Sequence, residues 1–271
     1  MGKAARAFVL LYGAALLVPM IWMVLGSFRP AHGMIVMPPR WDLGLTLENY
    51  RSALSVQLGR WILNSIILST GVTGLSLTMA LAGGYASAKL APYGGNAYLT
   101  GVVLSMLIPG IVTLVGSVQV ARFLGLYNTR AGMIIPQAGA GATLLFFRAF
   151  FRRTPDSFRE AAIVEGASEA RALMIQTPLA RSMIAVFGFT TFIGSWLSWL
   201  WPLVVSNRSD LYTHPIGMWI LAATTVRGGP GGIVDYGKQM AAAACGAAVL
   251  VVVFCLGQKY ITRGVLGDGD G

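Results

Sequence analysis

Long apolar runs separated by short polar stretches dominate this chain. Residues 61–88 and 90–121 contain no charged side chain, and only Lys89 stands between them. Runs of about 20 apolar residues are long enough to cross a bilayer core as helices, and these runs lack the alternation of a membrane barrel. We therefore predict an all-α integral membrane protein, one transmembrane domain over residues 1–271. Its spans, about six, are expected near residues 8–27, 62–88, 97–121, 131–151, 182–206 and 239–258.

The first run has two possible interpretations, a cleavable signal peptide or a spanning helix. Its apolar stretch from Phe8 to about Ser27 exceeds the roughly 7 to 15 residues of a signal-peptide core. No small-residue cleavage pattern follows it, and the chain leads instead into a polar loop from Arg29 to Arg60 that contains the Pro38-Pro39 turn. A spanning helix is the better interpretation.

Composition supports a membrane location. Hydrophobic residues make up 55% of the chain, charged residues only 11%, and the mean hydropathy is +0.67, whereas soluble domains carry roughly 25% charged residues. The formal charge of +10 comes from Lys and Arg at the ends of apolar runs, where topology and anionic lipid headgroups explain them without a nucleic-acid partner. Cys245 and Cys255 share one apolar run and lack zinc-type spacing, so no metal site is predicted.

The charges also predict which way the chain crosses the membrane. Cytoplasmic loops carry an excess of Lys and Arg, and the linker between the fourth and fifth spans is the richest in arginine. It holds Arg148, Arg152, Arg153, Arg159, Arg171 and Arg181. We expect this linker to lie on the cytoplasmic side.

The same linker has the signals of two short helices. Thr154 is a natural N-cap and Pro155 fits the first helical position, while Gly166 would end that helix and Ser168 would cap a second one. The alanines 161 and 162, with Phe158 and Ile163 nearby, would suit the groove of a partner protein. An amphipathic helix lying on lipid fits the same residues, and physical reasoning alone leaves both possibilities open.

The linker resembles a known signature. The run Glu160-Ala161-Ala162-x-x-x-Gly166, followed by Ile175-x-x-Pro178-Leu179, is similar to the "EAA" motif of binding-protein-dependent ATP-binding-cassette (ABC) importer permeases, in their carbohydrate, maltose-type branch. Other landmarks extend the resemblance over nearly the whole chain: Glu48-Asn49-Tyr50, Leu124-Gly125-Leu126-Tyr127-Asn128-Thr129, Trp201-Pro202-Leu203 and Gln258-Lys259-Tyr260.

This resemblance implies a mechanism and a set of partners. The fold would be that of a type I importer permease, and a coupling segment over residues 153–178 would dock on a cytoplasmic ATPase. Its coupling residues would be Glu160, Ala161, Ala162, Glu165, Gly166 and Pro178. Two ATPase subunits, a second homologous permease and an extracytoplasmic solute-binding protein would complete the importer in a bacterial or archaeal cell membrane.

The chain itself is expected to be non-catalytic and without a cofactor. It has no Gly-x-x-x-x-Gly-Lys-[Ser/Thr] loop for phosphates, so ATP would be bound by the partner subunits. It also lacks paired carboxylates, Ser/His groupings and metal-ligand spacing that would indicate an enzyme acting on lipid.

The chain departs from the family pattern at several positions. Glu165 stands where relatives usually have Asp, Thr177 stands where they have Leu, and Pro178 arrives one residue earlier than expected. One missing residue rotates a helix by roughly 100°. The second helix of the linker is therefore expected to be repacked or matched to an unusual ATPase.

Polar and aromatic residues inside the spans are the candidates for solute contact, because sugars bind hydrogen-bonding and aromatic groups. They are Asn64, Ser65, Gln119, Gln137, Trp196 and Trp199. Helix packing is the competing explanation for each. An ion-coupled secondary carrier is the alternative function, but such carriers place ionisable residues in mid-membrane, and the predicted spans contain none apart from Arg148 near the end of the fourth.

Overall fold

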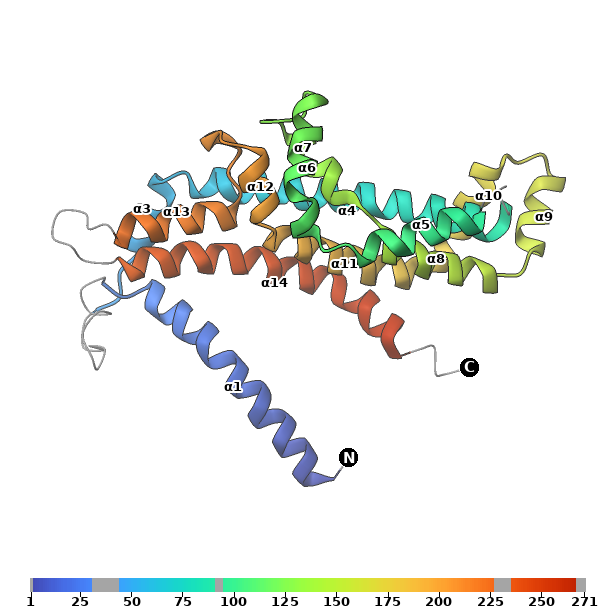
Figure 1. The fold of residues 1–271 in the computed structure, drawn as a ribbon. Coiled ribbons are helices and arrows are strands. Elements are labelled where there is room, and N and C mark those ends of the chain that lie inside the picture. Colours follow the sequence, from blue (N-terminus) through green and yellow to red (C-terminus); the bar gives the residue numbers. More distant parts are fainter. Residues whose placement is uncertain (1, 31–43, 91–94, 227–234, 267–271) are drawn as a thin grey trace. The chain divides into compact units, whose positions relative to one another are not determined.

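The computed structural model describes residues 2–30, 44–90, 95–226 and 235–266. Over these ranges the chain is helical and contains no strand (Figure 1). Pro38-Pro39 and His32, in the predicted first loop, lie outside the described residues. Within these described ranges, four helices are long and apolar enough to cross a membrane, and up to six spans result if each of two bent pairs counts as one span.

Three of the long helices agree with the predicted spans. Helix α1 (Lys3–Ser27) matches the first run, α4 (Leu58–Tyr85) continues into a π-helical turn η1 (Ala86–Leu90), and α14 (Tyr236–Leu266) contains the last run. None of the most apolar window of α1 is buried by the rest of the described chain. Its exposed large side chains are Leu, Val, Ile, Met and three aromatic residues, which lipid or another apolar helix would cover.

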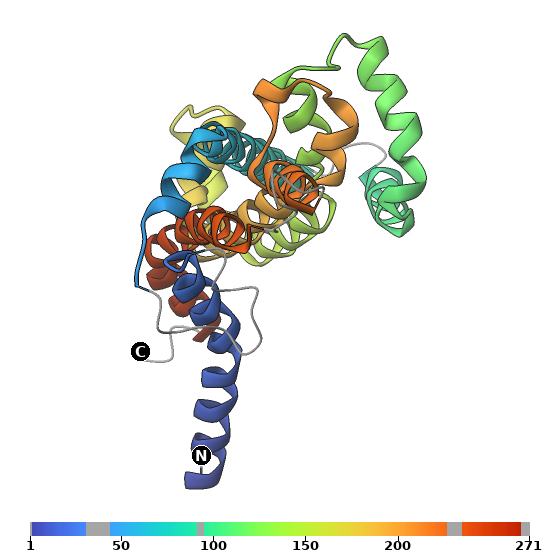
Figure 2. The same cartoon turned by 90° about the vertical axis from the view of Figure 1, so that its left-hand side faces the viewer.

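The predicted third and fourth spans are each broken. Helix α5 (Gly95–Leu107) meets α6 (Gly110–Phe123) at 108° (Figure 2), and α7 with η2 (Arg130–Ala138) meets α8 (Gly141–Arg153) at 50°. Pro109 stands at the first break and Pro136 shortly before the second. Proline has no backbone N–H to donate and disturbs the preceding turn, so each of the segments predicted as a span over 97–121 and 131–151 consists of two helices that meet at a bend.

The fifth predicted span, 182–206, is also divided. Helix α11 (Arg181–Leu197) ends where Ser198 adopts an extended conformation, and α12 (Leu200–Val205) follows. Two further helices lie in segments that the sequence assigned to loops: α3 (Glu48–Ser55) and α13 (His214–Val226), the latter after a short turn η4 (Ser209–Leu211). The stretch that forms α13 is apolar but, at 13 residues, shorter than a span.

The chain divides into two compact units. The first comprises Met1–Asn64 and Tyr212–Val251. Its core holds Leu58, Trp61 and Leu221, with small residues where the helices cross. A β-carbon on Gly217 would collide with the Trp61 ring, so only glycine allows that contact. Asn49 ties the end of α1 to α3 by donating to the carbonyls of Ser27 and Arg29, at 2.8 and 2.7 Å.

The second unit comprises Ser65–Leu211 and Val252–Gly271. One core cluster surrounds Leu68 and Val72 of α4. Another joins the end of α4 to α8 through Tyr85, Phe147 and Phe151. At Gly84 an added β-carbon would lie 2.8 Å from the Phe147 β-carbon. Glycine therefore sets the close approach of α4 and α8, as is common between membrane helices.

Candidate coupling segment and translocation residues

The linker between α8 and α11 folds into two short helices, as its sequence predicts. They are α9 (Ser157–Val164) and α10 (Glu169–Gln176), and a 3-10 turn η3 (Thr177–Ala180) that contains Pro178 leads into α11. Gly166 separates them with φ of +84°, a conformation that glycine adopts without strain. Ser168 caps α10, because its hydroxyl accepts a bond from the Arg171 N–H at 3.4 Å.

The predicted start of the first helix is wrong by a few residues. Thr154 ends α8, and its hydroxyl donates to the Phe150 carbonyl at 3.2 Å instead of capping α9. Asp156 occupies the N-cap position of α9, and its side chain makes no capping bond. The reason is a competing partner, because the Asp156 carboxylate accepts from Lys89 at the end of α4.

Most of the predicted coupling residues lie on the surface of this segment. Ala162 is the exception, since it is 5% exposed and packs inward. The exposed ones are Glu160, Ala161, Glu165, Gly166 and Pro178.

Large apolar side chains surround these residues. Val164 is 87% exposed and Met174 70% exposed. A shallow groove of about 260 Å³ lies between the helices, lined by Ser157, Phe158, Ala161, Ala162, Glu165 and Ile175. Exposed apolar surface of this kind on a charged segment is typical of a docking site.

The coupling segment is held to the end of α4 at two points. At the first, the Lys89 ammonium donates to the Thr154 carbonyl and to the Asp156 carboxylate, both at 2.6 Å. The Lys89 side chain is only 4% exposed, while that of Asp156 is 70% exposed. Hydrogen bonding and attraction from Lys89 lower the pKa of Asp156 below its ordinary value, so the carboxylate is charged at neutral pH.

At the second point, Glu169 joins both short helices to α4. Its carboxylate accepts from the Tyr85 hydroxyl at 2.9 Å and from the Arg159 Nε at 3.0 Å, and Arg159 Nη2 bonds the other oxygen. Tyr85 is buried and meets the Phe151 ring edge-on, with centroids 5.4 Å apart. Paired bonds between a guanidinium and a carboxylate are among the strongest side-chain contacts.

Sequence reasoning missed Tyr85, Arg159 and Glu169 as members of the site. One signal was available for the first point, since Lys89 is the lone charge between two uncharged runs. No signal was available for the second, because Tyr85 and Glu169 are 84 positions apart.

The predicted solute-pathway residues are spread over several elements. Asn64 and Ser65 are buried on α4, and Asn64 donates to the Tyr212 carbonyl at 3.0 Å. Trp196, at the end of α11, is also buried, with its ring stacked on Phe192.

The other three differ in their surroundings. Gln119 is exposed on α6, and Trp199, between α11 and α12, is 53% exposed. Gln137 donates to the Met133 carbonyl one turn earlier, at 2.8 Å. None of the six lines the coupling groove or the cavity described next.

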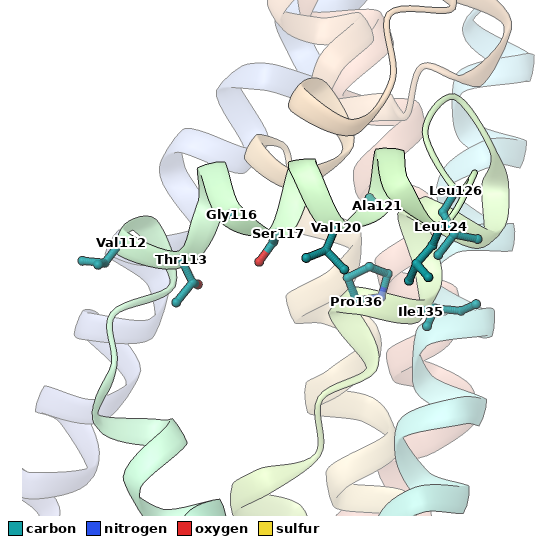
Figure 3. Close-up of a pocket in the computed structure, with 10 residues that line it drawn as sticks. All are labelled: Val112, Thr113, Gly116, Ser117, Val120, Ala121, Leu124, Leu126, Ile135 and Pro136. Carbon is teal, nitrogen blue, oxygen red and sulfur yellow. The ribbon is translucent and has the colours of Figure 1, made fainter.

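A larger cavity of about 480 Å³ lies against α6 and η2 (Figure 3). Thr113 and Ser117 supply its side-chain hydroxyls, and Figure 3 shows the Ser117 hydroxyl pointing to the open side beneath α6. The remaining lining is apolar: Val112, Gly116, Val120, Ala121, Leu124, Leu126, Ile135 and Pro136. Such a surface suits a hydrocarbon chain or an apolar helix better than a solute with many hydroxyls.

No metal centre is evident in the part of the chain that the structure describes, since no three His, Cys, Asp or Glu side chains gather there. Cys245 and Cys255 are free thiols on α14.

Several named relatives align with most of this chain. It is 26% identical to the diacetylchitobiose uptake system permease protein NgcG of Streptomyces coelicolor, over 96% of this chain and 86% of the relative. It is 27% identical to the arabinooligosaccharides transport system permease protein AraQ of Halalkalibacterium halodurans, covering 99% and 94%. The sn-glycerol-3-phosphate transport system permease protein UgpE of Yersinia pestis is 26% identical, covering 78% and 74%.

A solved structure has the same fold. A chain of a bacterial ABC transporter involved in the import of the acidic polysaccharide alginate aligns with a TM-score of 0.79 and 20% identity, over 96% of this chain and 98% of that one. No protein-family model matches the chain.

Proposed function

We propose that this chain, a multi-pass permease subunit of the carbohydrate-family ABC importers, forms half of a pathway through which ATP hydrolysis by docked partners drives solute uptake. The observation that carries the proposal is the coupling segment, residues 153–178. It is a pair of short helices between membrane helices, with exposed Phe158, Val164 and Met174 beside the motif residues. A partner with a complementary groove would bury this apolar surface.

The relatives support a sugar or a sugar-like compound as the solute. Two of them are named for oligosaccharides and a third for a phosphorylated polyol. These compounds share several hydroxyl groups, which need hydrogen-bonding partners along the pathway. Asn64 and Ser65 on α4, with Gln119, Gln137, Trp196 and Trp199, remain our candidates for those contacts.

We propose a second, homologous permease as the partner of these membrane helices. The apolar window of α1 is not covered by the described chain, and the cavity beside α6 has an apolar lining. Both surfaces fit helices of a homologous subunit, with lipid covering what remains. An extracytoplasmic binding protein would deliver the solute to the opposite side from the coupling segment.

Energy would come from ATPase subunits and not from this chain, which carries no phosphate-binding loop in its sequence. We infer that it is a non-catalytic subunit with no cofactor of its own. Nothing in the comparisons supports an ion-coupled carrier.

Replacing Ala161 tests the docking surface. Ala161 lines the groove and is exposed, so Ala161→Arg would place a long charged side chain where a partner must approach closely. We expect the chain to insert normally, and the ATPase subunits encoded in the same genome to stop co-purifying with it in detergent. Uptake of labelled diacetylchitobiose, arabinooligosaccharide or glycerol 3-phosphate, whichever the wild type takes up, should be lost.

Ala170→Arg is the matched control. Ala170 is an exposed alanine of the same segment but does not line the groove, so co-purification and uptake should persist. Full uptake by the Ala161→Arg chain would count against the coupling surface, and a wild-type chain that never binds an ATPase would refute the importer assignment.

A further inference from the structure

The coupling segment has two kinds of connection to the membrane helices. It is continuous in the chain with α8 before it and, through η3, with α11 after it. Its connection to α4 depends on side chains: Leu173 of α10 packs against the apolar cluster that includes Tyr85, and two polar contacts around Lys89 and Glu169 add directional bonds. Motion of α9 and α10 therefore reaches α4 only if non-covalent contacts hold.

The Lys89 contact is anchored on a buried cation. With 4% of its side chain exposed, the ammonium has little access to water, so it depends on the Thr154 carbonyl and the Asp156 carboxylate. Removing the partner of a buried charge is costly. This contact should therefore persist where a fully exposed ion pair would exchange with water.

The Glu169 contact ties α9 to α10 through side-chain bonds. Arg159 of α9 clasps Glu169 of α10 through paired bonds, and Tyr85 of α4 bonds the same carboxylate. The two anchoring residues, Tyr85 of α4 and Lys89 of η1, are four positions apart in one continuous helical stretch, so they lie on roughly the same side of its end. A displacement of either short helix would therefore pull on one side of the end of α4.

We propose that Tyr85 and Lys89 are positioning residues that form a latch, making α4 the span through which movement of a docked ATPase reaches the membrane pathway. The inference rests on the proposed function and adds the route of transmission. In the same helix, Asn64 and Ser65 are buried near the other end. A shift of α4 would thus move these two candidate solute contacts directly.

The latch can be broken without removing its packing. Tyr85→Phe removes one hydroxyl and keeps the ring against Phe151, and Lys89→Met keeps an unbranched chain but removes the charge. The matched control pair is Tyr236→Phe with Lys238→Met, at the start of α14. Lys89→Arg retains a donor and should restore whatever Lys89→Met loses.

The readout is movement of α4 in the assembled transporter. A nitroxide is attached at Leu63→Cys, an exposed position of α4, after Cys245→Ser and Cys255→Ser remove the native thiols. ATP with vanadate is the probe, because it traps the nucleotide-bound state of the partner ATPase and the solute need not be identified. We expect the spectrum to change on trapping with the wild-type latch, and that change to fall severalfold in the Tyr85→Phe, Lys89→Met double variant.

Two accompanying measurements separate the possible outcomes. The amount of ATPase that co-purifies and the amount of nucleotide trapped should stay at wild-type levels in the latch variants, because α9 and α10 keep their outer surface. An undiminished spectral change in the double variant would overturn the latch. So would a double variant that loses both ATPase binding and the spectral change. Failure of the wild-type chain to bind any ATPase would instead refute the proposed function.

Asp156→Asn is the substitute variant if the Lys89→Met chain does not accumulate in membranes. Asn keeps an oxygen that can accept from Lys89, and the Thr154 carbonyl remains a second acceptor, so this replacement should weaken the contact without preventing folding. It should give part of the same loss, and adding Tyr85→Phe should deepen it. An Asp156→Asn, Tyr85→Phe chain that moves like wild type would contradict the latch.

Discussion

At the scale of residues, a glycine and a lysine have different roles in the contact between the end of α4 and the end of α8. Gly84 lets α4 approach the backbone of α8 at Phe147 and Arg148. One helical turn further on, Lys89 reaches the chain that leaves α8 at Thr154. Small residues allow close helix packing in lipid, and a buried charge close to them must be compensated.

Gly84→Ala should destabilise the second unit. Its β-carbon would meet the Phe147 β-carbon at 2.8 Å and the Arg148 nitrogen at 2.9 Å, so the helices must separate, at a cost of about 1–3 kcal/mol. Thermal unfolding in detergent would show a lower midpoint. Gly74→Ala is the control in the same helix, since nothing lies within 4 Å of its added β-carbon, and its midpoint should not fall. Equal midpoints for both variants would contradict the close approach.

At the scale of elements, the coupling segment depends on one turn. Gly166 has φ of +84° and open space around it, so substitution there tests the backbone alone. The turn sets the angle between α9 and α10, on which both the groove and the Arg159–Glu169 contact depend.

Gly166→Ala should strain this turn by about 1–2 kcal/mol, because an L-residue adopts positive φ at a cost. We expect weaker binding of the ATPase partner in a pull-down titration, with normal insertion. Gly166→Asn should be milder, since asparagine tolerates the left-handed region better. If alanine and asparagine weaken binding equally, backbone strain is not the cause.

Element boundaries show where sequence reasoning succeeds and where it does not. Apolar runs located the membrane helices, and Gly166 and Ser168 located the turn in the coupling segment, because both signals are local. The breaks at Pro109 and Ser198 were missed because hydropathy does not report bending. Helix α13 was missed because its run is shorter than a span.

At the scale of the molecule, the predicted sites differ in how far local sequence determines them. The candidate coupling segment could be located because its motif is contiguous, and most of the motif residues are exposed. The latch could not be predicted, because its partners are far apart in the sequence: Tyr85 and Glu169 are 84 positions apart. The candidate solute contacts could not be grouped in this way, because they lie on several elements.

The whole transporter, purified and sealed into liposomes, gives the most direct test of the central claim that ATP hydrolysis beneath the membrane drives solute through this chain. Labelled solute and its binding protein are supplied outside, and ATP is enclosed within. The solute should accumulate only with enclosed ATP and an active ATPase, and Ala161→Arg should stop it. Equal accumulation without nucleotide, or by this chain alone, would contradict the claim.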